Sequence, residues 1–380
     1  MQTTEEDFVQ QIEFTESQQK LANAVLTVAG VAVKKGHLQY TSWIKIDVQK
    51  DKIEFTTTDT EVLIAYNVES CGIKKSGSVL VDALKFCEII KKMPSDTNIT
   101  VVSCGNNVKI ASDRIDFFLP ALDSKDFPVI SDTKEKFSID FDCSDLKFLL
   151  EGVKFAASTE SSRQSLNGVY IEFGQNCITS AATDIHRLAV AELKKNAEHS
   201  YCFILQKKTV NEVLKVVGMC KSIAVVMCGE QHVTKIKFCS DQIKIVSKLI
   251  AGTFPAFKNA IPKDLKFYAV LDKKDLKRSI ERVTTVLYEQ SKAIRLGIKK
   301  DRLQLEVTSS DSSFAKEAIS IKSNIEEEIQ IHFNYTYLLD AISVLNGKQI
   351  KMMFNGPSSQ VILCDPENKG LTNVVMPMMN

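Results

Sequence analysis

The feature that most constrains this chain is an internal repeat with a period of roughly 125 residues. Three helix-like segments carry matching leucine anchors, spaced 125 and 130 residues apart: Leu21, Leu146 and Leu276. Three further segments run from a short strand pattern into an amphipathic helix, and their anchors are spaced 124 and 128 residues apart: Val81, Leu205 and Phe333. Because two unrelated sets of positions give nearly the same period, we infer that one structural unit occurs three times along the chain.

Each repeat combines two helices with several short strands. Alternating apolar and polar residues predict paired strands at 42–48 and 52–57, at 223–228 and 233–239, and at 293–298 and 303–307. Helices that cover one face of an antiparallel sheet give an α+β fold. Polar, proline-bearing links divide the chain into domains at 11–132, 133–262 and 263–380, after a polar, acidic extension at 1–10 that we expect to be disordered.

The composition argues against several classes of protein. The 48 Lys and Arg residues nearly balance 47 Asp and Glu residues, so any nucleic-acid surface requires basic charge gathered on one face. The ten cysteines contain no Cys-x-x-Cys pair, and we expect neither a metal nor a cofactor. No secretory leader or long apolar run is present, so we expect a cytoplasmic protein that does not enter membranes.

A charged cluster lies in the middle of the second repeat, where residues 166–192 read as two strands joined by a loop. One hypothesis is a hydrolase in which Asp184 orients His186 as a general base, because residues two apart in a strand share a face. No Ser or Cys nucleophile stands beside this pair, however. A threefold repeat also has no evident use in an enzyme with one active site, so we favour a structural or binding role.

The same cluster carries a resemblance to a known family. Leu166-Asn167-Gly168-Val169, followed by Thr183-Asp184-Ile185-His186-Arg187-Leu188, resembles the middle domain of the bacterial DNA sliding clamps, the beta subunits of DNA polymerase III. Two further stretches match in the expected order, at 248–255 and 374–378. The resemblance covers nearly the whole chain, from about Phe14 to Asn380.

The resemblance implies a function without catalysis. Members of the family form a homodimeric ring whose helices line the bore and whose sheets form the outer wall. Duplex DNA passes through the ring, which holds phosphates without reading bases. The ring confers processivity by tethering the replicative polymerase, and it also engages the clamp loader, repair polymerases and other replication proteins through short linear peptide motifs.

The resemblance also implies where those peptide motifs bind. We expect a peptide pocket built from the central cluster, the segment after Phe254 and the chain end: Leu166, Thr183, Ile185, His186, Arg187, Leu188, Pro255, Ala260, Val374, Val375, Met376, Pro377 and Met378. A terminal sequence rich in methionine suits a surface that must accept several related peptides. Two positions depart from the family pattern: Ile185 replaces a glycine, and Met379-Asn380 replaces an Arg-Leu end.

Two more sets of residues carry expected roles. The residues expected near DNA are Lys35, Arg163, Gln164, Lys207 and Lys208. Gln164-Ser165 stand where the family often has aromatic residues. The residues expected at the dimer interface are Ile115 and Phe117, on one strand edge of the first repeat, and Val286 and Leu287, after the first helix of the third repeat.

Overall fold

The computed structural model describes residues 11–33, 39–125, 127–128, 130, 133–160, 162–197, 199–288, 291–368 and 370–378. The extension at 1–10 therefore lies outside the described residues. The chain divides into two compact units: the first contains 1–143 and 211–249, and the second contains 144–210 and 250–380. Within the described ranges, no helix is long and apolar enough to cross a membrane.

Each repeat contains two helices, and each helix directly follows a strand. The six pairs are β1 (Glu13–Ser17) with α1 (Gln18–Val28), β6 (Gly77–Asp82) with α2 (Ala83–Lys92), β10 (Glu135–Asp142) with α3 (Cys143–Glu151), β14 (Tyr201–Gln206) with α4 (Lys207–Val216), β18 (Phe267–Asp272) with α5 (Lys273–Val283), and β23 (Ile329–Asn334) with α6 (Tyr335–Val344). The anchors Leu21, Leu146 and Leu276 are all buried. The predicted α+β repeat is therefore confirmed.

The strand–helix junctions have a local chemical cause. The side chains of Asp82, Asp272 and Asn334 accept hydrogen bonds from the first backbone N–H groups of α2, α5 and α6. An acceptor at this position satisfies donors that have no partner within the helix. A short polar residue at the end of a strand thus starts the helix that follows.

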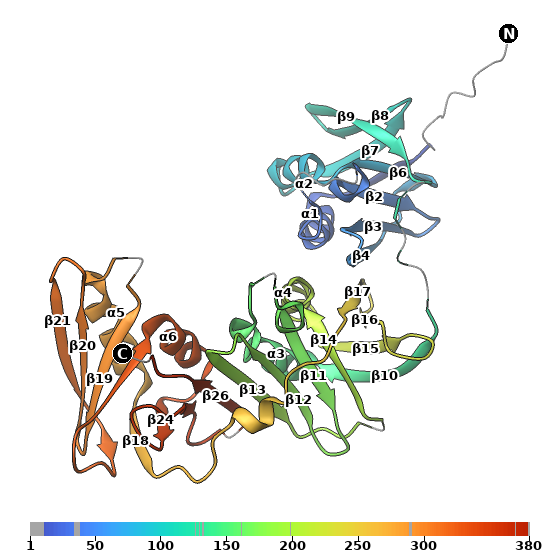
Figure 1. Cartoon of the computed structure of the whole chain (residues 1–380). Helices are drawn as coiled ribbons and strands as arrows, with labels where there is room; N and C mark the ends of the chain where they lie inside the picture. Colours follow the sequence, from blue (N-terminus) through green and yellow to red (C-terminus); the bar gives the residue numbers. More distant parts are fainter. Residues whose placement is uncertain are drawn as a thin grey trace. The chain divides into compact units, whose positions relative to one another are not determined.

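The first unit contains two antiparallel ladders. One ladder runs β5 (Ile73–Lys75), β1, β7 (Asn98–Cys104), β8 (Asn107–Ser112) and β9 (Ile115–Asp123). The other runs β10, β15 (Ser222–Cys228), β16 (Lys235–Cys239), β17 (Ile243–Ile250), β4 (Val62–Glu69), β3 (Lys52–Thr58), β2 (Trp43–Val48) and β6, which also pairs with the end of β9. Figure 1 shows α1 and α2 side by side on one face of these strands.

The second unit also contains two antiparallel ladders. One runs β14, β11 (Gly168–Phe173), β12 (Ile178–Thr183), β13 (Arg187–Leu193), β26 (Leu371–Val375), β25 (Val361–Cys364), β24 (Gln349–Phe354), β18 and β22 (Lys322–Ser323). The other runs β21 (Phe314–Ser320), β20 (Arg302–Thr308), β19 (Ala293–Lys299) and β23. Helix α5 packs against β20 and β21.

Successive repeats are joined by one rule of strand pairing. In the first unit, β4 of the first repeat pairs with β17, the last strand of the second repeat. In the second unit, β13 of the second repeat pairs with β26, the last strand of the third repeat. The corresponding strands left over are β21 in the third repeat and β9 in the first. Among the described residues, β21 pairs only with β20, and residues 115–120 of β9 pair only with β8.

Candidate functional site: a peptide hollow beside the chain end

A tight turn between β12 and β13 builds one wall of the site. Thr183 Oγ1 donates to the carbonyl of Arg187 at 2.7 Å and accepts from the backbone N–H of Ile185 at 3.0 Å. Asp184 Oδ1 accepts from the backbone N–H groups of His186 and Arg187 at 3.1 and 3.0 Å. These bonds hold Ile185 at φ 80°, a left-handed conformation that is rare for a β-branched residue.

The turn borders an apolar hollow of about 210 Å³ within the second unit. The hollow is smaller than the ~300–1,000 Å³ typical of sites for whole small molecules, which suits it to one or two side chains of a peptide. Its lining comes from the β12–β13 turn, the segment at 255–260 and the end of β26: Thr183, Ile185, Arg187, Leu188, Pro255, Ala256, Phe257, Ala260, Val374 and Met376.

The floor of the hollow is part of a buried apolar cluster. Leu188, Phe257 and Val374 belong both to this cluster and to the lining. Tyr170 packs against the cluster and stacks on Phe254 with ring centroids 4.9 Å apart. Burial raises the pKa of the Tyr170 phenol, so this ring remains neutral. Apolar side chains of a ligand gain free energy when they leave water and contact this apolar floor.

The structure brings most of the expected pocket residues together. Eight of them line the hollow: Thr183, Ile185, Arg187, Leu188, Pro255, Ala260, Val374 and Met376. Leu166 belongs to the buried cluster that also contains Leu188 and Val374, and Val375 is buried. Met378 is exposed, and its backbone N–H donates to the carbonyl of His332 at 2.8 Å. Pro377 is half-buried, and Met379-Asn380 lie outside the described residues.

Two lining residues, Ala256 and Phe257, were not singled out from the sequence. Both directly follow Pro255, and Phe257 begins the short helix η4 (Phe257–Ala260). The adjoining Thr-Phe-Pro-Ala-Phe run was a usable signal, because aromatic residues beside a proline in a loop need an apolar partner.

The Arg187 side chain is fixed by contacts with its own turn and with residues of the second and third repeats. Its Nε donates to Asp184 Oδ2 at 3.0 Å, and Nη2 donates to the carbonyl of Phe155 at 2.9 Å. Its Nη1 forms an ion pair with Asp340 on α6, and its guanidinium carbon lies 4.4 Å from the ring centre of Tyr337. The guanidinium therefore links residues of the second and third repeats inside one unit.

The Asp184 carboxylate does not orient His186 for catalysis. Both of its oxygens are bound to the turn backbone or to Arg187. The His186 ring stacks on Tyr337 at 6.3 Å, and the His186 carbonyl accepts from the backbone N–H of Met376 at 2.9 Å. This geometry gives the hydrolase hypothesis no support.

The residues expected near DNA are spread over several environments. Arg163 and Gln164 are exposed; Arg163 precedes the short helix η3 (Gln164–Leu166), and Gln164 begins it. Lys207 is half-buried at the start of α4, where its Nζ donates to the carbonyl of Ala157 at 3.3 Å, and burial lowers its pKa. Lys208 is also half-buried, and Lys35 lies outside the described residues.

The residues expected at the dimer interface lie at or beside the two unpaired strand edges. On β9, Ile115 is half-buried, while Phe117 and its neighbour Phe118 are 39% and 60% exposed. Val286 ends the short helix η5 (Thr284–Val286), which packs against β20 and β21. Leu287 follows it, and both residues are half-buried.

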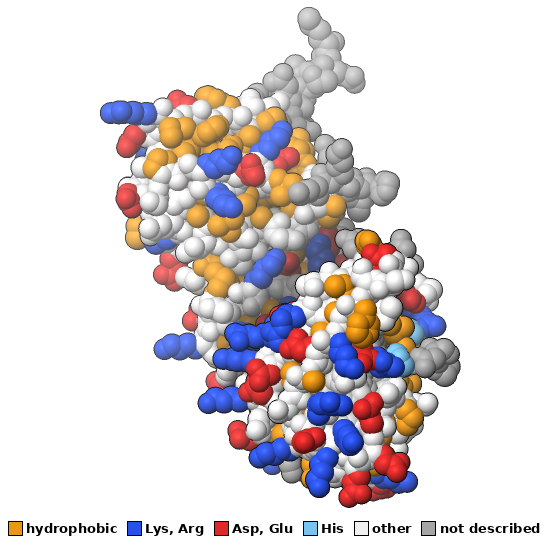
Figure 2. All heavy atoms as spheres, turned by 90° about the vertical axis from the view of Figure 1, so that its left-hand side faces the viewer, with side chains coloured by type: hydrophobic (Ala, Val, Ile, Leu, Met, Phe, Trp, Pro, Cys, Tyr) orange, Lys and Arg blue, Asp and Glu red, His pale blue; other side chains and the backbone are white. Residues whose placement is uncertain are grey.

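Charge on the face that carries β20 and β21 is mixed. Figure 2 shows acidic and basic side chains interspersed over the lower part of the view. Two ion pairs account for part of this pattern: Lys316 lies 3.0 Å from Glu306, and Arg282 pairs with Glu317. This face is therefore not a continuous basic surface of the kind that attracts DNA.

Comparison with known proteins places the whole chain in one family. Three family models match in succession: the N-terminal domain of the DNA polymerase III beta subunit at 12–131, the central domain at 140–256 and the C-terminal domain at 258–379. The chain is 26% identical to the beta sliding clamp of Pseudomonas putida, over 96% of this chain and 99% of that protein. It is 28% identical to the beta sliding clamp of Caulobacter vibrioides, over 94% and 97%.

Solved structures agree with this assignment. The DnaN sliding clamp of Pseudomonas aeruginosa bound to griselimycin is 25% identical, with a TM-score of 0.91 over 97% of this chain and all of that one. The beta sliding clamp of C. crescentus with polyethylene glycol bound is 27% identical, with a TM-score of 0.92 over 98% of this chain and all of that one. The resemblance predicted from the sequence is confirmed: this chain belongs to the DNA polymerase III beta subunit family, the family of the bacterial beta sliding clamps.

Proposed function

We propose that two copies of this chain close head to tail into a ring that encircles duplex DNA and confers processivity on the replicative polymerase. The observation that carries the proposal is the pairing rule between repeats. Strand β4 pairs with β17 and β13 pairs with β26, so β21 and β9 are the matching edges left for a second copy. A closed ring of two chains leaves neither edge open, so neither edge can pair with further chains and cause aggregation.

The ring needs no catalytic group of its own. Its three domains, at 11–132, 133–262 and 263–380, hold the protein on DNA because the closed ring surrounds the duplex. Basic side chains such as Arg163 and Lys208 attract phosphates without base readout. We place this activity in the cytoplasm, where the replication proteins of a bacterial cell meet the chromosome.

The hollow beside the chain end is the proposed docking site for linear motifs of the replicative polymerase, the clamp loader and repair polymerases. Exposed Ile185 and Met376 extend its apolar lining outward, so a bound peptide would cover side chains that now face solvent. Burying two apolar anchors contributes roughly 3–6 kcal/mol before ordering costs, which by itself corresponds to a dissociation constant of about 10 mM to 10 μM. Tighter binding of an isolated peptide requires further contacts.

Retention on closed DNA tests the ring. The chain is loaded by a clamp loader onto a nicked circular plasmid, the complex is isolated by gel filtration at about 0.2 M salt, and the plasmid is then cut once. Release on cutting is the expected result, because topology and not contact energy holds the protein. Equal retention on circular and linear DNA would refute the proposal.

A further inference from the structure

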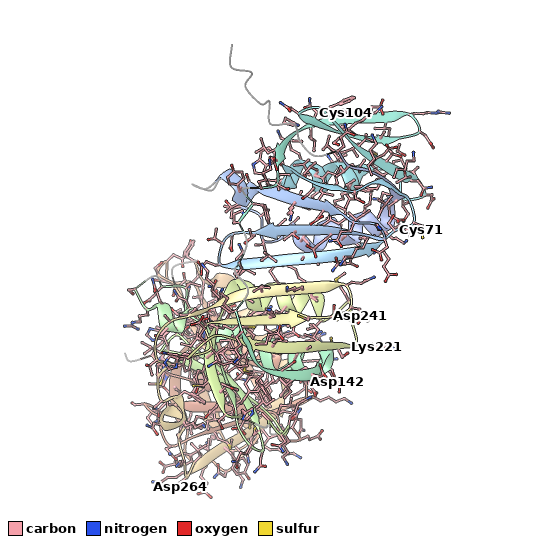
Figure 3. The ribbon with its side chains drawn as sticks, turned by 90° about the vertical axis from the view of Figure 1, so that its right-hand side faces the viewer. Cys71, Cys104, Asp142, Lys221, Asp241 and Asp264 are labelled. Carbon is pink, nitrogen blue, oxygen red and sulfur yellow. The ribbon has the colours of Figure 1, made fainter. Side chains whose placement is uncertain are left out.

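A second hollow lies within the first unit, on the sheet that contains β2, β3, β4, β16 and β17. It has a volume of about 180 Å³. In Figure 3, strands β17, β16, β15 and β10 of this sheet lie one after another. The labels Asp241, Lys221 and Asp142 mark ends of these strands. The lining is Lys45, Glu54, Thr56, Leu63, Ala65, Phe127, Pro128, Ile130, Thr133, Lys235, Lys237, Lys244 and Val246.

This hollow lies where the first and second repeats join, and its lining corresponds in part to that of the peptide hollow, where the second and third repeats join. The turn from Thr58 to Leu63 matches the turn from Thr183 to Leu188, 125 residues later. Thr58 Oγ1 donates to the carbonyl of Val62 at 2.9 Å, and Thr60 has φ 78°, as Ile185 has φ 80°.

The neighbouring strands match as well. Leu63 pairs with Val246 across the first junction, as Leu188 pairs with Val374 across the second. The Phe127-Pro128 pair repeats Phe254-Pro255. Leu63, Pro128 and Val246 line this hollow, as Leu188, Pro255 and Val374 line the peptide hollow, so the two hollows share part of their framework.

The side chains at matching positions differ in charge. Lys45 faces Thr56 across the β2–β3 pair, where the second repeat has Tyr170 facing Ala181. Lys237 faces Val246, where the third repeat has Ile362 facing Val374. Two positions that belong to or pack on the apolar cluster of the peptide hollow thus carry lysine in the first unit.

The result is an apolar floor with a basic rim. Leu63, Phe127 and Val246 supply apolar surface, whereas among the described residues of the lining four lysines and one carboxylate, Glu54, supply the charges.

Carboxylates outside the lining hold two of these lysines. Lys45 lies 3.4 Å from Asp47, and buried Lys237 lies 3.1 Å from Glu135, whose side chain is mostly exposed. Thr133 Oγ1 is buried in the same hollow without a hydrogen-bond partner among the described residues, so a polar group from outside would satisfy it.

We propose that this hollow binds a short acidic peptide segment of a partner protein, with one apolar side chain on the floor and flanking carboxylates on the lysine rim. The small volume favours a few side chains over a whole small molecule. The lysines favour carboxylates, which compact ammonium groups hold by salt-sensitive attraction. The site is separate from the peptide hollow of the second unit and selects a different class of peptide.

The test measures binding of a fluorescein-labelled peptide, acetyl-Asp-Glu-Leu-Asp-Glu-amide, to the full chain by fluorescence anisotropy at about 50 mM salt. The neutral counterpart, acetyl-Asn-Gln-Leu-Asn-Gln-amide, should bind about tenfold more weakly or worse, because charge complementarity supplies the selectivity. The combined Lys45→Gln and Lys244→Gln variant should weaken the acidic peptide by about tenfold.

A matched control removes two lysines elsewhere in the first unit. The combined Lys74→Gln and Lys75→Gln variant changes exposed residues of β5 and should alter the affinity less than about twofold. Replacing the leucine of the acidic peptide by serine should also weaken binding, because the serine buries less apolar surface on the floor. Binding by charge attraction alone would be unaffected by this replacement.

Three results would overturn the proposal. One is an equal loss of affinity in the two lysine variants, which would indicate unspecific attraction. Another is equal binding of the acidic and neutral peptides. The last is loss of acidic-peptide binding when residues 376–380 are deleted, which would assign the peptide to the hollow of the second unit.

Discussion

Ring closure through β9 can be tested with one charged substitution, Phe117→Glu. In the single chain 39% of Phe117 is exposed, and a phenylalanine buries roughly 150–250 Å² in a core or interface, so about 60–100 Å² remains to be covered by a partner. At about 25 cal/mol per Å² this area contributes roughly 1.5–2.5 kcal/mol per interface. A ring of two chains contains the interface twice, so the loss doubles to about 3–5 kcal/mol.

A loss of that size raises the dimer dissociation constant by roughly two to four orders of magnitude. The buried carboxylate of the new glutamate adds a desolvation cost in the same direction. Sedimentation or light scattering at about 1 μM should therefore report a folded monomer of 42.4 kDa for the variant and twice that mass for the unchanged chain.

The matched control is Tyr268→Glu on β18, an aromatic that is 41% exposed and lies outside both unpaired edges. This variant should remain dimeric. Phe314→Glu, on the edge strand β21, should behave like Phe117→Glu. A Phe117 variant that stays dimeric at 1 μM, with unchanged thermal unfolding, would refute the assignment of β9 as a ring-closing edge.

Three further predictions concern the chain end, the DNA surface and the strained turn. Deleting residues 376–380 should abolish peptide binding in calorimetry while leaving the dimer and its thermal unfolding largely intact; unchanged affinity would place the partner site elsewhere. Combining Lys207→Glu with Lys208→Glu should lower the salt dependence of duplex binding by up to about two units, and an unchanged slope would exclude both lysines from phosphate contact. Ile185→Gly should be more stable than Ile185→Ala by about 0.5–1 kcal/mol in denaturant titration, because only glycine relieves the left-handed backbone; the opposite order would show that φ is not positive there.

The repeat spacing predicted the helices, and alternating residues predicted some of the strands, because burial has a periodic signature. The positions Leu146, Leu149 and Leu150 are all buried, as a helix that covers a sheet requires. Leu26 shows the limit of the same reasoning. It is apolar and adjoins buried Val25, yet it is 46% exposed on α1, because adjacent residues of a helix point in different directions.

The sequence did not predict which strands pair between repeats. A pattern of alternating residues shows that a strand has a buried face, but it does not name the neighbour. The pairing of β4 with β17 therefore came only from the structure, as did the identity of β21 as an unpaired edge.

The charged cluster around Asp184 shows how a structural motif can imitate a catalytic one. Asp59 stands 125 residues earlier, and its Oδ1 accepts from the backbone N–H groups of Glu61 and Val62 at 3.0 and 2.7 Å, as Asp184 accepts from its own turn. A search of the sequence for this second Thr-Asp pair at the repeat spacing would have identified the aspartate as a turn residue. The positive φ of Ile185, by contrast, has no signal in the isoleucine itself; the glycine that the family pattern has at this position was the available signal.

The repeated turn separates the scaffold from the residues that select a partner. The threonine and aspartate bind backbone in both the first and second repeats, so their polar atoms serve to fix the turn. Selection must then reside in the side chains that the turn and its neighbouring strands present. At corresponding positions, Tyr170 packs against the apolar cluster of the peptide hollow, whereas Lys45 lines the hollow of the first unit. Corresponding strands and turns thus contribute to two hollows whose side chains differ in charge, and this difference in charge is what the proposed difference in peptide preference rests on.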